Sequence, residues 1–100
     1  MYTINNSSIH GEGIIATQNI KSKDKIGLAL YLKFNFIPII TKDLGKKINH
    51  SYKPNAYLKK TKNKNEWYLF ANQNIKKNEE ITINYKDTPW FIDGPMPWYR

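Results

Sequence analysis

Three short clusters in this 100-residue chain combine side chains suited to binding or catalysis. The first is Gly11-Glu12-Gly13, because a Gly-x-Gly turn lets a ligand or another segment approach the backbone closely. It also satisfies the dinucleotide-binding pattern G-x-G-x-x-A, but that fingerprint requires a helix directly after the glycines. The residues after Gly13 are rich in Ile and Thr and predict a strand instead. We therefore reject dinucleotide binding, and a plain turn stays the competing interpretation.

The second cluster is Asn49-His50-Ser51, followed shortly by Pro54-Asn55. Its amide, imidazole and hydroxyl groups can hydrogen-bond a polar ligand. A metal site is not expected, because His10 is the only other histidine and the chain has no cysteine. The absence of cysteine also excludes a disulfide framework, a thiolate zinc site and a cysteine nucleophile. The competing interpretation is a polar loop with a capping Asn and a turn Pro.

The third cluster is the segment Glu79-Glu80-Ile81-Thr82-Ile83-Asn84-Tyr85. Its alternation predicts a strand that carries Ile81, Ile83 and Tyr85 on one face. A tyrosine at the end of such a strand can direct its hydroxyl at a bound molecule. The competing interpretation is a packed ring whose hydroxyl reaches water.

Short strands make up most of the chain around these clusters. The sequence predicts strands over residues 13–20, 26–32, 36–40, 56–60, 66–72 and 80–85. A single helical turn is expected over residues 41–46, with Thr41 or Asp43 as its N-cap and Gly45 at its end. No window of a dozen residues has a helical stripe, so the predicted fold class is mainly β.

An internal repeat relates residues 16–26 to residues 71–81, with six of eleven positions identical at an offset of 55. Each copy has the pattern of a strand end, a tight polar turn and the start of the next strand. Two copies are too few for a solenoid. The repeat predicts a pseudo-symmetric β fold of two related hairpins, and chance similarity in a chain rich in Lys, Asn and Ile is the competing interpretation.

The charge balance is strongly basic, with 16 basic residues against 8 acidic ones and a formal net charge of +8. Fifteen of the sixteen basic residues are lysine, whereas arginine is the residue favoured for planar contacts to nucleic acid. The positive charge is therefore compatible with a nucleic-acid partner, but it is not evidence for one. The chain length predicts one domain. Its polar start and the lack of a long apolar stretch predict an intracellular protein, cytoplasmic or nuclear in a eukaryotic host, that is neither secreted nor bound to a membrane.

Taken together and in this order, the three clusters resemble the SET-domain family of protein-lysine methyltransferases, in its minimal stand-alone form known from viruses and microbes. The resemblance runs from about Ile9 to Tyr99. It implies a mainly β, β-clip type fold of small sheets with a knot-like C-terminal threading. It also implies a SET-domain core over residues 1–87 and an aromatic post-SET-like segment over residues 88–100 that closes the active site.

The activity that the resemblance implies is transfer of a methyl group from S-adenosylmethionine to a lysine ε-amine, without a metal. Tyr85 is the implied catalytic residue, with its hydroxyl directed at the methyl group and the sulfonium. Asn49 and Lys47 are implied to hold the methionine end of the cofactor. The implied cofactor-binding residues are Gly11, Glu12, Gly13, Lys47, Asn49, His50, Tyr85 and Trp98.

The implied channel for the substrate lysine is lined by Tyr31, Leu58, Ile83, Trp90 and Phe91. For the aromatic residues, simple sealing of a small core is the competing interpretation. The implied partner is a protein that presents a lysine, and a homodimer is compatible with the resemblance. Two other functions stay open at this point. One is a catalytically inactive SET-fold module that binds a peptide or nucleic acid, and the other is a basic β-barrel that stacks bases on Trp67, Tyr68 and Phe70.

Overall fold

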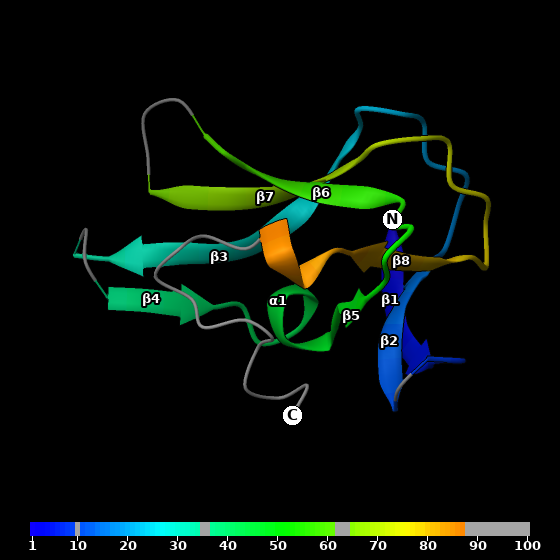
Figure 1. Ribbon diagram of the computed structural model, residues 1–100, viewed down its shortest axis with the longest axis horizontal. Coiled ribbons are helices and arrows are strands. Elements are labelled where there is room, and N and C mark those ends of the chain that lie inside the picture. The colour runs from blue at the N-terminus through cyan, green and yellow to red at the C-terminus, as the bar shows by residue number, and fades with distance from the viewer. Residues whose placement is uncertain (10, 35–36, 62–64, 88–100) are drawn as a thin grey trace.

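The computed structural model describes residues 1–9, 11–34, 37–61 and 65–87, and these form two four-stranded sheets (Figure 1). The first sheet has the strand order β1-β2-β8-β5. Its strands are β1 (Tyr2–Asn6), β2 (Glu12–Ala16), β8 (Glu80–Ile83) and β5 (Asn49–His50). β1, β2 and β8 pair antiparallel, whereas β5 joins β8 in parallel. This sheet therefore contains all three clusters or their immediate neighbours.

The second sheet is antiparallel throughout and has the strand order β4-β3-β7-β6. Its strands are β3 (Lys25–Lys33), β4 (Ile37–Ile40), β6 (Ala56–Lys60) and β7 (Glu66–Ala71). A short helix, α1 (Leu44–Lys47), and a 3-10 turn, η1 (Tyr85–Asp87), complete the described elements. None of the helices in these ranges is long and apolar enough to cross a membrane.

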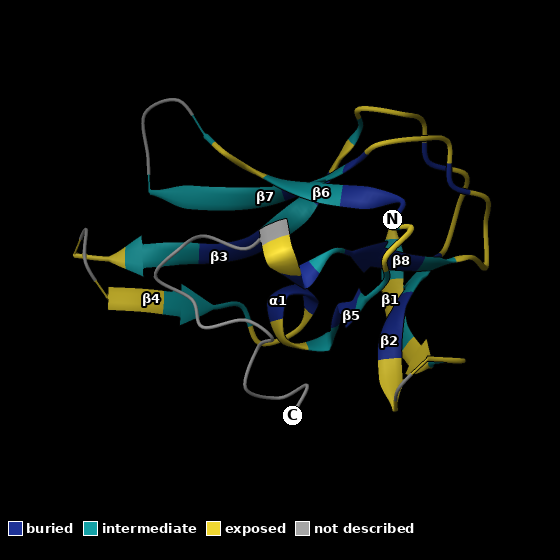
Figure 2. Cartoon of the chain, viewed as in Figure 1, coloured by how far each residue is buried: buried dark blue, intermediate teal, exposed yellow. Residues whose placement is uncertain are grey.

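One hydrophobic core joins the two sheets. Ile14 and Ile81 of the first sheet and Leu69 of the second have no exposed surface, and Leu44 of α1 packs in the same cluster. Figure 2 shows the buried residues in dark blue at the centre of the molecule, along β2, β8 and α1. Burial of each such aliphatic side chain contributes about 1.5–3 kcal/mol to the stability of the fold. It also determines which face of each short strand points into the core.

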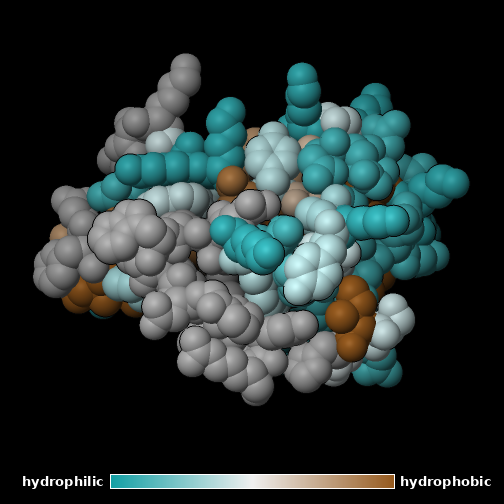
Figure 3. Space-filling view, viewed as in Figure 1, coloured by the Kyte–Doolittle hydropathy of each residue, from teal (hydrophilic) through white to brown (hydrophobic). Residues whose placement is uncertain are grey.

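The repeated segments pack against each other about a local two-fold axis. Residues 16–24 and 71–79, which we call the clasp, run side by side at the right of Figure 1. At its centre Ile20 and Ile75 exchange two backbone hydrogen bonds, of 2.7 and 2.8 Å, and both side chains are buried. The outer surface of the clasp is polar, and hydrophilic side chains dominate that side of the molecule in Figure 3. The pseudo-symmetry that the repeat predicted is therefore present in the fold. The prediction of two hairpins was wrong, because each copy joins a strand of one sheet to a strand of the other.

The bonds away from the clasp centre also occur in symmetric pairs. In the first pair, Ala16 N–H donates to Glu79 O at 2.9 Å and Ala71 N–H donates to Asp24 O at 3.0 Å. In the second pair, Asn78 N–H donates to Ala16 O at 2.8 Å and Lys23 N–H donates to Ala71 O at 2.7 Å. Equivalent turn residues share one left-handed conformation, with φ of 74° at Lys23 and 77° at Asn78. The second copy leads directly into β8, so the clasp sets where that strand begins.

Several sequence-based boundaries need correction. The strand predicted over residues 13–20 ends at Ala16, because from Ala16 to Ile20 the backbone bonds with residues 75–79 in the other half of the clasp. Gly45 does not end the helical turn: Thr41 Oγ accepts its N–H at 2.8 Å, and the helix continues to Lys47. Asp43 stands at the N-cap without a side-chain cap bond. Tyr85 lies in η1 and not in the strand, whose last residue is Ile83.

Some of the remaining strands were predicted closely, and others were not predicted. β6 has the predicted bounds, and β3, β4 and β7 differ from theirs by one residue at one or both ends. β1 and β5 were not predicted, because β1 is polar at three of five positions and β5 has only two residues. The aromatic segment 88–100 and the knot-like threading lie outside the described residues and stay predictions.

Candidate active site

The second and third clusters meet where β5 runs parallel to β8. Asn49 lies opposite Thr82 and His50 opposite Ile83 in the register of this pair. Ser51 N–H extends the pairing by donating to Ile83 O at 2.9 Å. Residues more than 30 positions apart are thereby brought into one short ladder.

Asn55 stabilises this strand pair by bonding to the edge of β8 that faces away from β5. Its Oδ1 accepts Thr82 N–H at 2.9 Å, and its Nδ2 donates to Glu80 O at 2.9 Å. The side chain is only 8% exposed, so both bonds are largely shielded from water. The amide thus satisfies a donor and an acceptor of β8 as a strand partner would, which explains why an Asn follows the Asn-His-Ser motif at this distance.

The Tyr85 hydroxyl is held just before the start of β5. It donates to Ile48 O at 2.7 Å, and the residue is 4% exposed. Tyr85 N–H donates to His50 Nδ1 at 3.0 Å, and the two rings lie 5.1 Å apart between centroids. Because Nδ1 accepts a hydrogen bond, the proton of the neutral imidazole is on Nε2 in this arrangement. The backbone and hydroxyl of Tyr85 are therefore both anchored to residues 48–50.

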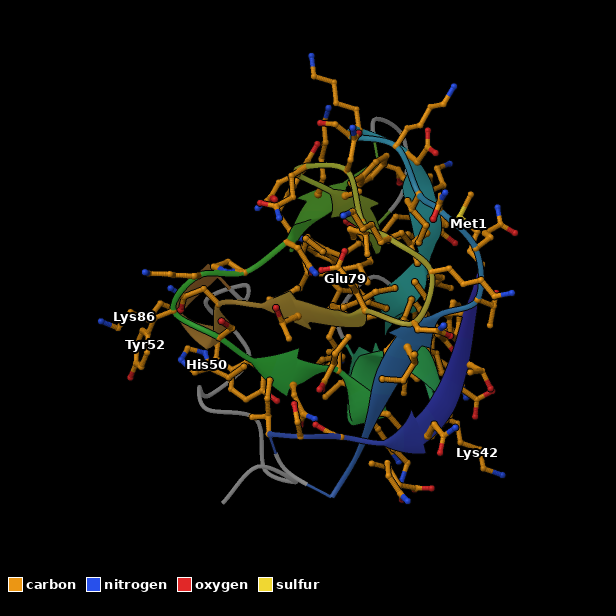
Figure 4. The ribbon with its side chains drawn as sticks, turned by 90° about the vertical axis from the view of Figure 1, so that its right-hand side faces the viewer. Met1, Lys42, His50, Tyr52, Glu79 and Lys86 are labelled. Carbon is orange, nitrogen blue, oxygen red and sulfur yellow. The ribbon has the colours of Figure 1, made fainter. Side chains whose placement is uncertain are left out.

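The outer edge of this site carries an exposed aromatic ring. Tyr52 packs edge-on against His50, with ring centroids 4.4 Å apart, and is 76% exposed. Lys86 Nζ lies 6.0 Å from the centroid of the Tyr52 ring. The three side chains form one group at an edge of the molecule in Figure 4. Sequence reasoning gave Tyr52 and Lys86 no role.

The Gly-x-Gly turn reaches the same site through Asn49. Asn49 Nδ2 donates to Glu12 O at 3.2 Å, and Lys47 Nζ lies 3.0 Å from Glu12 Oε1 in an ion pair. Gly13 is buried, whereas Gly11 is exposed and adopts a φ of 48°. The first cluster is therefore in contact with the second, with one positive and one negative side chain at its rim.

Two further residues of this site were not predicted. Glu80 accepts hydrogen bonds from Asn49 Nδ2 at 2.9 Å and from Ser7 Oγ at 2.7 and 2.8 Å. Ser7 Oγ also accepts from Asn49 Nδ2 at 3.0 Å. Glu80 stands in the third motif and could have been singled out there. Ser7 follows an unpredicted strand, and no sequence pattern pointed to it.

The expected lysine-channel residues are only partly brought together. Ile83 is buried on β8, directly before the turn that carries Tyr85, and Leu58 packs partly buried against the same core. Tyr31 lies on β3, opposite Ile39 and Glu66 in the second sheet. Three more expected residues, Trp90, Phe91 and Trp98, lie outside the described ranges, as does His10. Within those ranges no group of three His, Cys, Asp or Glu residues could hold a metal ion.

Comparison with known proteins matches the chain to one family. The SET domain family model matches residues 33–86, more than half of the chain, including Asn49 and Tyr85. A curated relative from Schizosaccharomyces pombe, named as a histone-lysine N-methyltransferase specific for H3 lysine-37, is 34% identical over 86 residues. The match covers 84% of this chain and 50% of that protein, so the chain spans about half the length of this relative.

A solved structure gives the same result for the fold. A Plasmodium falciparum protein, described as a candidate histone methyltransferase, superposes with a TM-score of 0.70 over 89% of this chain and 100% of that one. The two sequences are 24% identical, so this likeness concerns the fold alone.

Proposed function

We propose that this chain, which belongs to the SET-domain family, is a protein-lysine N-methyltransferase that uses S-adenosylmethionine. The observation that carries the proposal is the placement of the Tyr85 hydroxyl, which is buried and held on Ile48 O next to Asn49. The name of the yeast relative supports a lysine of a protein as the substrate.

The residues around Asn49 fit the methionine end of S-adenosylmethionine. That end is a zwitterion, and the site rim offers a lysine and a carboxylate, Lys47 and Glu12, beside the Asn49 amide. We assign its binding to these side chains and to the backbone of residues 11–13, and assign the adenine to the backbone of His50. When bound, S-adenosylmethionine supplies a methyl group on a sulfonium, whose carbon–sulfur bond breaks as the lone pair of the amine forms the new nitrogen–carbon bond.

Tyr85 would stabilise the positive charge near the reacting atoms. Its hydroxyl hydrogen is directed to Ile48 O, so its oxygen can act only as an acceptor. An oxygen dipole fixed in a shielded site favours a nearby cation more than the same dipole in water, because the local dielectric is low. As a neutral group it does so without competing with the amine for the methyl.

The substrate amine must reach the site without its proton, because an ammonium group has no lone pair. We propose that Ile83 and Leu58 line the inner part of the lysine channel and that Tyr31 contributes at a greater distance. An aliphatic wall lowers the pKa of a lysine amine by removing water from it. It also leaves room for more than one methyl group on the nitrogen.

We further propose that the core over residues 1–87 is completed by residues 88–100. In this proposal Trp98 stacks on the adenine or borders the channel, and Trp90 and Phe91 form part of the channel wall. An aromatic wall attracts a methylated ammonium group through cation–π interactions.

Transfer of label from tritiated S-adenosylmethionine to lysine residues in a cell lysate tests the proposal. We expect Tyr85→Phe to lower the initial rate at least ~10-fold, as is typical when a group that stabilises transition-state charge is removed. Tyr57→Phe is a matched control, because Tyr57 stacks on Phe70 in the second sheet, with ring centroids 5.8 Å apart. Equal rates for the wild type and Tyr85→Phe would refute the role of Tyr85. A wild type that binds the cofactor and labels nothing would favour the inactive binding module.

A further inference from the structure

The second sheet has one face that points away from the core, and aromatic rings gather on it. Along β7, Leu69 and Ala71 are buried in the core, whereas Tyr68 and Phe70 lie on the opposite face and are half-buried. Tyr57 of β6 lies directly opposite Phe70 in the register, so it shares that face. Such alternation is typical of an antiparallel sheet with one face packed and the other in water. We call this side the outer face of the second sheet.

Helix α1 and the first sheet lie against the inner face. Gly27 of β3 is opposite Leu69 in the register and therefore belongs to the inner face. A Cβ on Gly27 would lie 3.0 Å from Leu44 of α1 and 3.5 Å from the ring of Tyr2 on β1. Both elements thus pack on the inner side, and the rings of the outer face stay partly exposed.

Three rings from two neighbouring strands lie together on the outer face. Tyr57 and Phe70 stack, with centroids 5.8 Å apart and an angle of 20° between the ring planes. Tyr68 is two residues before Phe70 on the same strand, so it is the next ring on this face. Trp67 belongs to the inner face, opposite Lys60 in the register. Of the three aromatic residues considered above for base stacking, Trp67 is therefore not part of this group, and Tyr57 joins it.

Exposed lysines lie beside these rings. Lys59 is opposite Tyr68 and Lys25 is opposite Phe70 in the register. Lys25 Nζ lies 4.5 Å from the centroid of the Tyr68 ring, in a cation–π contact. Glu66, two residues before Tyr68, is the acidic side chain of β7 on this face. Two lysines against one glutamate leave the surroundings of the rings positively charged, which suits an anionic partner.

We propose that the outer face of the second sheet binds a single strand of nucleic acid. Its bases stack on the three rings and its phosphates contact the two lysines, which together are Tyr57, Tyr68, Phe70, Lys25 and Lys59. Surfaces that bind single strands combine aromatic rings, on which any base can stack, with positive charge along the strand. The net charge of the chain alone does not support such a partner, but lysines placed beside exposed rings do. A duplex fits this face less well, because its bases are already paired and stacked.

The contact between Lys25 and Tyr68 is compatible with this use of the face. An exposed cation–π contact is weak, so the ammonium group can leave the ring for a phosphate, and the uncovered ring then accepts a base. Lysine suits this exchange because its charge is compact and its stem is flexible. These contacts involve base faces and phosphates and not the sugar, so single-stranded DNA is an adequate probe.

This proposal goes beyond methyl transfer and does not depend on it. Asn49 lies in the first sheet and Tyr85 in the turn that follows β8, whereas the three rings and the two lysines belong to the second sheet. The two proposed activities therefore use different surfaces of the chain, and failure of one leaves the other intact.

Fluorescence anisotropy with a labelled oligothymidylate of about ten nucleotides, titrated with the full chain at several salt concentrations, tests the proposal. We expect the double variant Lys25→Gln, Lys59→Gln to reduce the slope of log K against log salt by about 1.4, since each phosphate contact of a single strand contributes about 0.7. The double variant Lys76→Gln, Lys77→Gln is the matched control, because it removes the same charge from exposed residues of the clasp. It should keep the wild-type slope.

A further variant tests the rings. We expect Tyr68→Thr, which keeps a residue suited to a strand, to weaken binding about 5- to 100-fold, the range for one lost stacking contact. Tyr52→Thr removes a ring that is 76% exposed and lies outside this face, and it should keep the wild-type affinity. If Tyr68→Thr does not fold, as judged by circular dichroism, the comparison of the two lysine variants decides alone.

Three results would overturn the proposal. The first is the absence of binding by the wild type at low salt. The second is an equal effect of the two lysine variants, or an affinity for a duplex of the same length that equals or exceeds that for the single strand, because either shows binding by net charge. The third is a dimer, found by analytical ultracentrifugation of the chain alone, that Tyr68→Thr dissociates, because it would assign the face to a second copy.

Discussion

Replacing Gly13 with alanine should destabilise the fold mainly through Glu80. The backbone of Gly13 is not in the left-handed region, so an alanine there causes no conformational strain of its own. The new methyl group instead occupies the space of the Glu80 carboxylate and lies 3.0 Å from Asn49 Nδ2. The carboxylate has to move, and its bond to Asn49 is weakened or lost.

The expected cost is the sum of two terms. Forcing an extra methyl group into a packed site costs about 1–3 kcal/mol. Loss of a hydrogen bond to a charged group costs about 1.5–3 kcal/mol. Since partial relaxation of the side chains reduces both, we expect Gly13→Ala to lower the free energy of unfolding by about 3 kcal/mol. For a domain of this size that corresponds to a fall of roughly 15 °C in the unfolding midpoint.

A double-mutant cycle with Glu80→Ala isolates the contact. Glu80→Ala alone should cost about 2 kcal/mol, because its hydrogen bonds to Ser7 and Asn49 disappear. Once the carboxylate is gone, Gly13→Ala should cost less than ~1 kcal/mol, which gives a coupling energy of about 2 kcal/mol. Urea unfolding of the four proteins, followed by circular dichroism, measures each value without any ligand.

The same glycine substitution in a Glu79→Ala background is the control. Glu79 is exposed, so there Gly13→Ala should keep its full cost. Additive costs for Gly13→Ala and Glu80→Ala, within about 0.5 kcal/mol, would refute the explanation of Gly13 by the carboxylate.

Two further predictions concern backbone groups. His50→Asn keeps a side-chain acceptor for Tyr85 N–H, whereas His50→Leu removes it. We therefore expect the Leu variant to lose about 1–3 kcal/mol of unfolding free energy in urea, and equal losses in both variants would contradict the role of the imidazole nitrogen. In the clasp, Lys23→Gly should stabilise the protein by about 0.5–1 kcal/mol in thermal unfolding, since lysine is strained at a φ of 74°. Asn78→Gly should change little because asparagine tolerates its φ of 77°, and an equal gain at both positions would count against this reasoning.

The sequence predicted most of the second sheet well, because its strands are of ordinary length and follow period-two patterns. It did not predict β1, whose exposed edge position requires few apolar residues. The repeat predicted pseudo-symmetry, which the symmetric hydrogen bonds of the clasp confirm. It also predicted two hairpins and did not predict the clasp, because similar sequences indicate similar local conformations and not which segments pack together.

The candidate site was harder to predict because long-range hydrogen bonds from side chains build it. Tyr85 is not part of β8, because its N–H donates to the His50 ring instead of to a neighbouring strand. The alternation of apolar and polar residues around Tyr85 does not indicate such a bond. Asn55 bonds to β8 across 27 positions of sequence, and Ser7 reaches Glu80 across 73. The motifs identified most of the residues involved, but which atoms they bond could be read only from the folded chain.

β8 has four residues and is nevertheless restrained at its start, middle and end. The clasp holds the backbone just before it, Asn55 bonds to Glu80 and Thr82 within it, and the His50 ring bonds to Tyr85 just after it. A strand tied at three points has little conformational entropy left to lose. A ligand that binds along it meets a preorganised surface, so little of its binding free energy is needed to order the protein.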